Sequence, residues 1–172
     1  MPILHLDERD VQRLLHWEDL IPAMESALLA FSTGRALQPV RNMLSIEEGR
    51  RYLGIMPAVI DEAMGLKLVS FYPANANKGI PTHMAMILLL RPDTGEPLAV
   101  MDGRLITEMR TAAVSAAVTN RVASPVSRSL AILGSGVKRL GYGAEHPNTR
   151  GGSLRSMAPS QWMRSLLSKE QM

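Results

Sequence analysis

The sequence predicts an α/β fold in which two helices precede a mostly antiparallel sheet and a long helix follows it. Three observations support this prediction. Apolar residues recur at helical spacing over 7–33, short β-type runs fill 40–102, and an alanine-rich stretch covers 104–122. With 172 residues, of which 46% are hydrophobic and 20% charged, the chain is long enough to form a packed core.

The two N-terminal helices are indicated by their apolar spacing. The first, over 7–16, begins with acidic residues and carries Val11 and Leu14 on one face. The second begins at Glu18 and ends before Gly34. Its continuous apolar stripe is predicted to consist of Leu20, Ile21, Met24, Ala27, Leu28 and Phe31.

The middle of the chain predicts an antiparallel or mixed sheet. The two last strands of this sheet are joined by "RPDTGEP", whose proline, aspartate and glycine residues suit a hairpin loop. The expected strands are "VRNMLSI", "RYLGIMPAV", "GLKLVSFYP", "MAMILLL" and "LAVMD".

A long helix over 104–122 and a buried strand near 129–134 complete the predicted elements. Thr107 is expected to cap the helix at its N-terminus. The helix is expected to pack through a stripe of small or apolar side chains, which are Met109, Ala113, Ala117 and Val118. Residues 138–172 contain no clear strand and one weak helical stretch at 161–168, so we expect a poorly ordered tail.

Charge and composition exclude several classes of function. Residues 1–137 hold 13 basic and 14 acidic side chains, whereas 138–172 hold 6 and 2, so the net charge of +3 originates in the tail. That distribution, without patterned aromatic residues, does not predict nucleic-acid binding. The chain has no cysteine and no His or carboxylate cluster at ligand spacing, so we expect no metal site. With no signal-peptide pattern and no apolar run long enough to cross a bilayer, we expect a cytoplasmic protein without a membrane partner.

Three cations occupy unusual positions. Lys67 shares a strand face with Val69 and Phe71, so it requires an anionic partner or lies near a sheet edge where it can reach water. Arg110 lies on a helix side lined by alanine and valine, so it binds an anion or forms an internal salt bridge with Asp102 or Glu108.

Arg41 opens a strand, and with Lys67 and Arg110 it offers three cations for one carboxylate, although the sequence does not show that they converge. His83 precedes the most apolar strand and is interpreted as structural or catalytic. Met56 and the other methionines are most simply core residues.

The stretch "GSGVKR" at 134–139 matches part of the dinucleotide-binding fingerprint. Its first two glycines follow a strand, as close approach to a pyrophosphate requires. Its third small residue is replaced by Arg139, and no second strand ending in an acid is evident downstream. The fingerprint is therefore incomplete.

The chain resembles the ornithine cyclodeaminase and mu-crystallin family, which includes ketimine reductases and some alanine dehydrogenases. The resemblance covers 1–137 and rests on "QPVRN", "RYLGIMPA", "GLKLVSFYP", "PTHMAMILLLRPDTGEPLAVMDG", "ITEMRTAAVSAAVTN" and "LAILGSGV". It implies a substrate-binding and dimerisation domain at 1–128, the first strand and glycine turn of a Rossmann domain at 129–137, and a divergent tail at 138–172.

The resemblance also implies site residues. The substrate would be bound by Arg41, Met56, Lys67 and Arg110. NAD or NADP would lie against Thr82, His83, Arg110, Gly134, Ser135, Gly136 and Val137. No catalytic residue is assigned, because the family's catalytic aspartate has no recognisable counterpart.

The expected function follows from this resemblance. The parent activity is NAD(P)-dependent chemistry on an amino or imino acid, either ornithine cyclodeamination or ketimine reduction. We expect a truncated, homodimeric family member that is inactive alone because most of the cofactor domain has no counterpart. The alternative is a non-catalytic subunit that binds a small ligand or dimerises.

Overall fold

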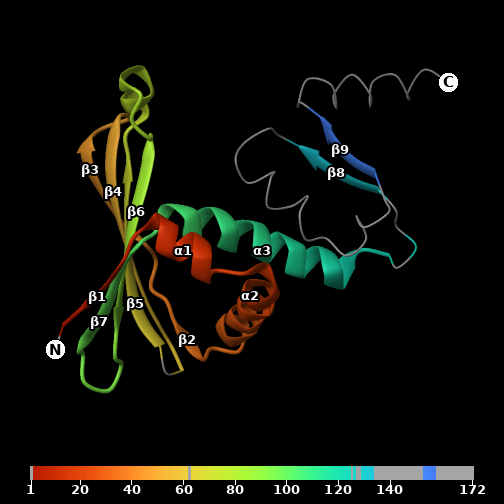
Figure 1. Ribbon diagram of the computed structural model, residues 1–172, viewed down its shortest axis with the longest axis horizontal. Coiled ribbons are helices and arrows are strands. Elements are labelled where there is room, and N and C mark those ends of the chain that lie inside the picture. The colour runs from red at the N-terminus through yellow and green to blue at the C-terminus, as the bar shows by residue number, and fades with distance from the viewer. Residues whose placement is uncertain (1, 62, 125, 127–128, 134–152, 158–172) are drawn as a thin grey trace.

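The computed structural model describes residues 2–61, 63–124, 126, 129–133 and 153–157. A large sheet forms one layer, and three helices lie against one of its faces (Figure 1). Strands β8 and β9 form a separate two-stranded sheet. No helix in the described part of the chain has the length and apolarity needed to span a membrane.

The two N-terminal helices form where the sequence predicts them. Helix α1 (Glu8–Leu14) begins with a capping box, in which the Asp7 carboxylate accepts from the backbone N–H of Asp10 at 2.9 Å. Helix α2 (Trp17–Ser32) follows directly. The predicted α2 stripe is correct at Leu20, which is buried, but wrong at its C-terminal end. There Ala30 is buried, whereas Phe31 is 56% exposed.

The large sheet is mostly antiparallel, as predicted. Its strand order is β1-β7-β6-β5-β4-β2, and β3 also pairs with β4. The strands are β1 (Leu4–Leu6), β2 (Ala36–Leu37), β3 (Asn42–Glu47), β4 (Arg51–Ile60), β5 (Ala63–Phe71), β6 (His83–Leu90) and β7 (Pro97–Asp102). A 3₁₀ helix, η1 (Pro73–Lys78), lies between β5 and β6.

Two short strands were not predicted from the sequence. Strand β1 pairs with β7 in parallel, and strand β2 pairs with the end of β4. Both have three residues or fewer, too few for an alternating pattern to appear. The predicted hairpin between β6 and β7 is confirmed, with the Gly95 N–H donating to the Arg91 carbonyl at 2.8 Å.

Helix α3 (Arg104–Val122) has the predicted length, but its predicted cap is wrong. Gly103 is the N-cap residue, and the Asp102 carboxylate accepts from the Arg104 N–H at 2.9 Å, so Thr107 lies inside the helix. The Gly103 N–H donates to the Ala85 carbonyl at 2.8 Å, and a side chain at Gly103 would come within 3.0 Å of Ala85. This close approach fixes the start of α3 beside β6.

The core between α2 and α3 uses small side chains. The fully buried residues of α3 are Ala112, Ala113, Ala116 and Ala117. Two of the four predicted stripe residues, Ala113 and Ala117, are therefore confirmed as buried. Val118 is 46% exposed, because the buried seam follows the alanine pairs around the helix.

The predicted strand near 129–134 is observed as β8 (Ser129–Leu133). It pairs in parallel with β9 (Ser153–Met157), so the prediction of a tail without a strand is wrong. The segment "SLRSM" contains only two apolar residues and no β-branched residue, which explains why its sequence did not indicate a strand. The glycine turn at 134–137 lies outside the described residues.

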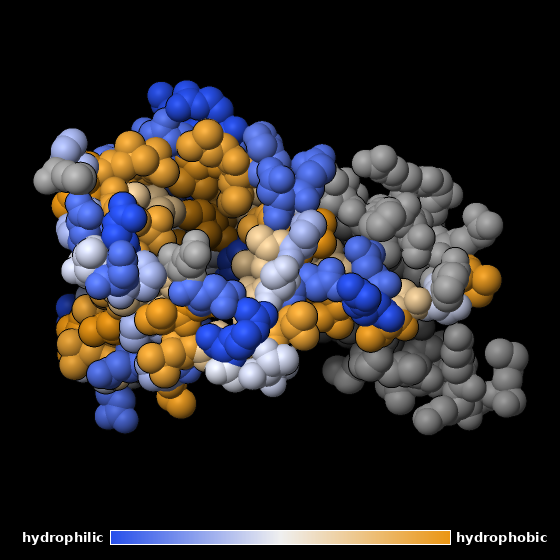
Figure 2. All heavy atoms as spheres, turned by 90° about the horizontal axis from the view of Figure 1, so that it is seen from below, coloured by the Kyte–Doolittle hydropathy of each residue, from blue (hydrophilic) through white to orange (hydrophobic). Residues whose placement is uncertain are grey.

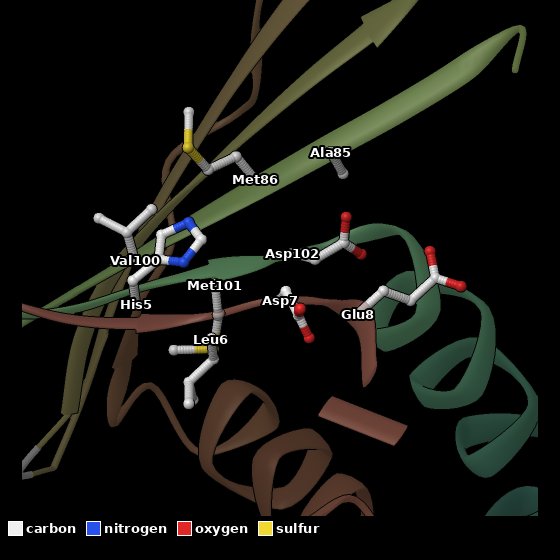
Figure 3. A pocket seen from close by; sticks show the side chains of 9 residues that line it. All are labelled: His5, Leu6, Asp7, Glu8, Ala85, Met86, Val100, Met101 and Asp102. Carbon is white, nitrogen blue, oxygen red and sulfur yellow. The ribbon is translucent and has the colours of Figure 1, made fainter. Parts of the chain in front are cut away.

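The register of the large sheet shows which side chains lie on each of its two faces. Lys67 pairs with Ile87, and their neighbours Leu68 and Met86 also pair, so these two pairs lie on opposite faces. Figure 3 shows the same separation on β1 and β7: Met101 points toward helix α2, whereas Val100 and Met86 lie on the other side. Lys67 and Met101 thus share the face that the helices cover.

The open face of the sheet is also apolar. Antiparallel sheets with one packed face commonly carry polar residues on the other. Figure 2 shows hydrophobic side chains gathered over the part of the molecule that the sheet builds. By register, the open face carries Leu44, Leu53, Ile55, Leu66, Leu68, Met84, Met86 and Leu88.

Candidate functional site

A cavity of about 850 Å³ lies between the covered face of the sheet and helix α3. Strands β4 and β5 supply its sheet side, helix α3 supplies Thr107 and Arg110, and the end of α2 supplies Phe31. The segment before β3 closes it with residues 38–41. The lining residues are Phe31, Gln38, Pro39, Val40, Arg41, Met43, Tyr52, Met56, Pro57, Lys67, Val69, Phe71, His83, Thr107 and Arg110.

The cavity brings together the three cations singled out in the sequence. Lys67 projects from β5 on the same face as Val69 and Phe71, and all three line the cavity, as their alternation predicts. Arg41 immediately precedes β3, and Arg110 projects from the second turn of α3. The strand and helix patterns placed Lys67 and Arg110 on their elements, whereas Arg41, expected to open a strand, lies just before β3. The convergence of the three cations depends on the packing of α3 over the sheet.

The cavity is lined by three positively charged side chains, those of Arg41, Lys67 and Arg110. None of the described residues that line it is acidic. Burial lowers the pKa of the Arg110 guanidinium, and the positive charge of Arg41 lowers it further. The site is therefore electrostatically complementary to an anion.

The internal salt bridge considered for Arg110 is absent from the described residues. Its two candidate partners serve Arg104 instead: Glu108 accepts from the Arg104 guanidinium at 3.3 Å, and Asp102 accepts from the Arg104 N–H. The Arg104 guanidinium also pairs with Glu8 of helix α1. These acids therefore stabilise the start of α3 and do not pair with Arg110, whose side chain lines the cavity.

The remaining predicted residues divide into three groups. Met56 lines the cavity next to Lys67, its register partner, and His83 lines it at the start of β6. Thr82 is not among the lining residues, and its carbonyl accepts from the Tyr72 N–H at 2.8 Å. Gly134, Ser135, Gly136 and Val137 lie outside the described residues.

Sequence reasoning missed three polar residues of the cavity, which are Gln38, Tyr52 and Thr107. Tyr52 accepts a hydrogen bond from the Gly49 N–H at 2.8 Å through its hydroxyl. Thr107 was assigned to a cap, although its position three residues before Arg110 places both on one helix face. Its Oγ1 atom is buried without a hydrogen-bond partner among the described residues.

A second, smaller cavity of about 240 Å³ lies where β1 meets α1, β6 and β7. Figure 3 shows the carboxylates of Asp7, Glu8 and Asp102 near the start of the helices, and His5 farther along the strands. Asp7 and Asp102 accept helix N–H groups, and Glu8 pairs with Arg104. No group of three or more His, Cys, Asp or Glu in the described part of the chain is placed to hold a metal ion.

Comparison with known proteins shows which family shares the sequence of this chain. A sequence model of the ornithine cyclodeaminase/mu-crystallin family matches residues 4–140. Ketimine reductase mu-crystallin of Mus musculus is 46% identical over 124 residues, which cover 69% of this chain and 40% of that protein. The chain thus spans about 40% of the length of this curated relative.

Two solved structures share the fold. Thermococcus litoralis Δ1-pyrroline-2-carboxylate reductase in complex with NADH and L-proline aligns with a TM-score of 0.79 and 32% identity, covering 98% of this chain and 54% of the other. An archaeal alanine dehydrogenase dimer with bound NAD aligns with a TM-score of 0.85 and 28% identity, covering 98% and 53%.

Proposed function

Because the chain belongs to the ornithine cyclodeaminase/mu-crystallin family, we propose that its cationic cavity binds the carboxylate of a small amino or imino acid. The observation that carries this proposal is the convergence of Arg41, Lys67 and Arg110 in a cavity whose described lining residues include no acid. A carboxylate between the two guanidinium groups relieves their mutual repulsion and accepts hydrogen bonds from both.

Each cation has a distinct role in this proposal. Arg41 and Arg110 supply planar donor sets that can hold carboxylate oxygens, whereas Lys67 supplies a point charge from the sheet side. Met56, which pairs with Lys67 in the β4–β5 ladder, offers an apolar contact to the carbon skeleton of the ligand. L-proline, the ligand named for the Thermococcus litoralis relative, has the required size and charge.

The family also points to NAD(H) or NADP(H) as the cofactor. The cavity volume of about 850 Å³ lies within the range of small-molecule and cofactor sites, roughly 300–1,000 Å³. His83 and Arg110 line it and would lie on the nicotinamide side, with Thr82 at the adjoining strand end and the turn 134–137 at the pyrophosphate. A bound cofactor would exchange hydride with the carbon of an imino or amino acid, while this chain's residues orient the carboxylate.

Calorimetric titration with L-proline and with L-prolinamide tests the proposal. Prolinamide retains the ring but lacks the carboxylate, so we expect the chain to bind L-proline and to lose most of that affinity with prolinamide. Equal affinity for the two ligands, or no binding of L-proline by the folded chain, would contradict the proposal.

Titration with NADH and a turnover assay then separate the two functional alternatives. For this chain alone we expect ligand binding without turnover, since its match to the family ends at residue 140. The chain would then act as a non-catalytic ligand-binding subunit. Turnover of Δ1-pyrroline-2-carboxylate with NADH would instead assign it the complete reductase activity.

We also propose that the chain forms a homodimer through the open face of its sheet. This face presents Leu44, Met84 and Met86, which are 56%, 40% and 47% exposed. A contiguous apolar sheet face of this kind is typical of an interface between subunits. The related archaeal alanine dehydrogenase is a dimer, which supports a second copy as the occupant. Light scattering coupled to size-exclusion chromatography tests this, and a monomer at micromolar concentration would contradict it.

A further inference from the structure

Helix α3 carries a regular series of hydroxyl side chains, spaced four residues apart at positions 107, 111, 115 and 119. Three of them donate to the carbonyl four residues earlier. Thr111 donates to Thr107 at 2.7 Å, Ser115 to Thr111 at 3.2 Å and Thr119 to Ser115 at 2.7 Å. This back-bonding is the usual way in which a helical hydroxyl satisfies its hydrogen-bonding capacity.

Thr107 departs from the series. The carbonyl four residues before it, that of Gly103, accepts from the Thr107 backbone N–H at 2.9 Å, as in an ordinary helix. The Thr107 hydroxyl does not donate to the Gly103 carbonyl. It has no hydrogen-bond partner among the described residues, although its oxygen is buried. The same residue lines the cationic cavity. A buried hydroxyl without a partner costs free energy, so a hydrogen-bond acceptor brought to this position would be stabilising.

The surroundings of Thr107 identify that group. Arg41, Lys67 and Arg110 line the same cavity and their charged groups are donors only, so none of these groups can accept the hydroxyl proton. Thr107 and Arg110 are one helical turn apart, so their polar atoms can approach the same ligand from one side. An anionic oxygen bound by the cations is the acceptor that this arrangement lacks.

We propose that Thr107 is a ligand-binding residue whose hydroxyl donates a hydrogen bond to the carboxylate of the bound amino or imino acid. This inference rests on the proposed function, because the carboxylate is the group that the cations hold. The unsatisfied hydroxyl is thus a stability cost in the ligand-free chain that ligand binding removes.

The test uses Thr107→Val, which keeps the β-branched shape but lacks the hydroxyl, and Thr107→Ser, which retains it. L-proline is titrated calorimetrically into the full chain and both variants. We expect Thr107→Val to weaken L-proline binding by about 10- to 100-fold, the loss typical of a hydrogen bond to a charged group, and Thr107→Ser to stay close to wild type. Thr119→Val is the matched control, because its hydroxyl bonds only within the helix.

Thermal unfolding of the ligand-free proteins provides a second readout. Removing a buried hydroxyl that has no partner should raise the Tm, by about 2–4 °C for a gain of this kind in a chain of this size. Thr119→Val loses a hydrogen bond and should lower the Tm without changing L-proline affinity. A Thr107→Val variant that is more stable yet binds less tightly distinguishes a ligand-binding hydroxyl from a structural one.

The outcomes separate this inference from the proposed function. If wild type binds L-proline and Thr107→Val binds it equally well, the role of Thr107 is overturned while carboxylate binding stands. A Thr107→Val variant with a lowered Tm would show that the hydroxyl serves the fold, which also overturns the inference. If the folded wild-type chain does not bind L-proline, the proposed function fails and the assignment of Thr107 fails with it.

Discussion

The guanidinium of Arg41 acts on that of Arg110 across the cavity, where burial lowers the pKa of Arg110 and the charge of Arg41 lowers it further. Arg41 comes from the segment before β3 and Arg110 from helix α3, so the fold brings two like charges together. Like charges that face one cavity repel each other, and an anion between them removes that repulsion. The relationship between these two residues is therefore better explained by ligand binding than by the stability of the fold.

Replacing Arg110 with methionine tests that explanation. We expect Arg110→Met to weaken L-proline binding by about 10- to 100-fold, corresponding to roughly 1.5–3 kcal/mol for a charge-assisted hydrogen bond. The variant should unfold at the same urea concentration as wild type or at a higher one, because the repulsion from Arg41 is removed. Calorimetry and urea unfolding measure the two effects.

Arg121→Met is the matched control for this variant. Arg121 lies on the same helix but pairs with Glu25 of α2, away from the cavity lining. It should leave L-proline affinity unchanged. A similar loss of affinity in both variants would indicate a general effect on α3 and would argue against a specific role for Arg110.

The capping box of α1 predicts a pH dependence of stability. The hydrogen bond from the Asp10 N–H lowers the pKa of the Asp7 carboxyl in the folded chain. The stabilisation from Asp7 is therefore complete above its unfolded pKa of about 3.9 and is lost as the pH falls through the lower folded value. Asp7→Ala should be less stable than wild type at pH 7, and the difference should shrink as the pH falls below the unfolded pKa.

Urea unfolding at a series of pH values measures this convergence. Asp93→Ala, which changes a carboxylate in the exposed β6–β7 loop, serves as the control and should follow wild type at all pH values. A stability difference between Asp7→Ala and wild type that persists unchanged at low pH would mean that the Asp7 charge contributes nothing to the cap.

A lysine on the open sheet face should disrupt the proposed dimer. Met86 is 47% exposed and lies in the middle of that face, so Met86→Lys would place a charge in the apolar interface. We expect light scattering to give a monomer mass or a dimer constant weakened at least about tenfold. Leu29→Lys, at a 60% exposed position on α2, should leave the dimer intact. Dimerisation of Met86→Lys with wild-type affinity would exclude this face.

The buried alanines of α3, at positions 112, 113, 116 and 117, predict that this helix tolerates larger side chains poorly. Ala113 is 0% exposed, so Ala113→Leu must displace its neighbours and should cost about 1–3 kcal/mol of unfolding free energy. Val118→Leu, at an exposed position on the same helix, should change it by less than about 0.5 kcal/mol. Urea denaturation compares the two, and equal stabilities would mean that the buried alanines are loosely packed.

Local patterns explain why much of the fold was predictable. The acidic start of α1, the apolar spacing of α2 and the alanines of α3 each specify a helix within one segment. The five longer strands alternate or carry apolar runs in the same way. Strands β1, β2 and β9 are short or polar, and β1 and β9 form through pairing with distant residues, which the sequence does not reveal locally.

The cavity was predictable only in part. A cation on an apolar face is visible in the sequence, which is how Lys67 and Arg110 were found. Thr107 was not found as a cavity residue, because a threonine near a helix start fits a cap equally well. In the structure Asp102 supplies the capping acceptor instead. That the described lining residues include no acid could not be predicted either, since Glu8 and Glu108 pair with Arg104 instead.

A crystal structure of the chain with pyrrole-2-carboxylate, a planar and unreactive carboxylate, tests the central claim most directly. We expect its carboxylate to lie between Arg41 and Arg110, near Lys67, with an oxygen within hydrogen-bonding distance of Thr107 Oγ1. Electron density for the carboxylate outside this cavity, or an unliganded cavity at a concentration that saturates binding in solution, would contradict it.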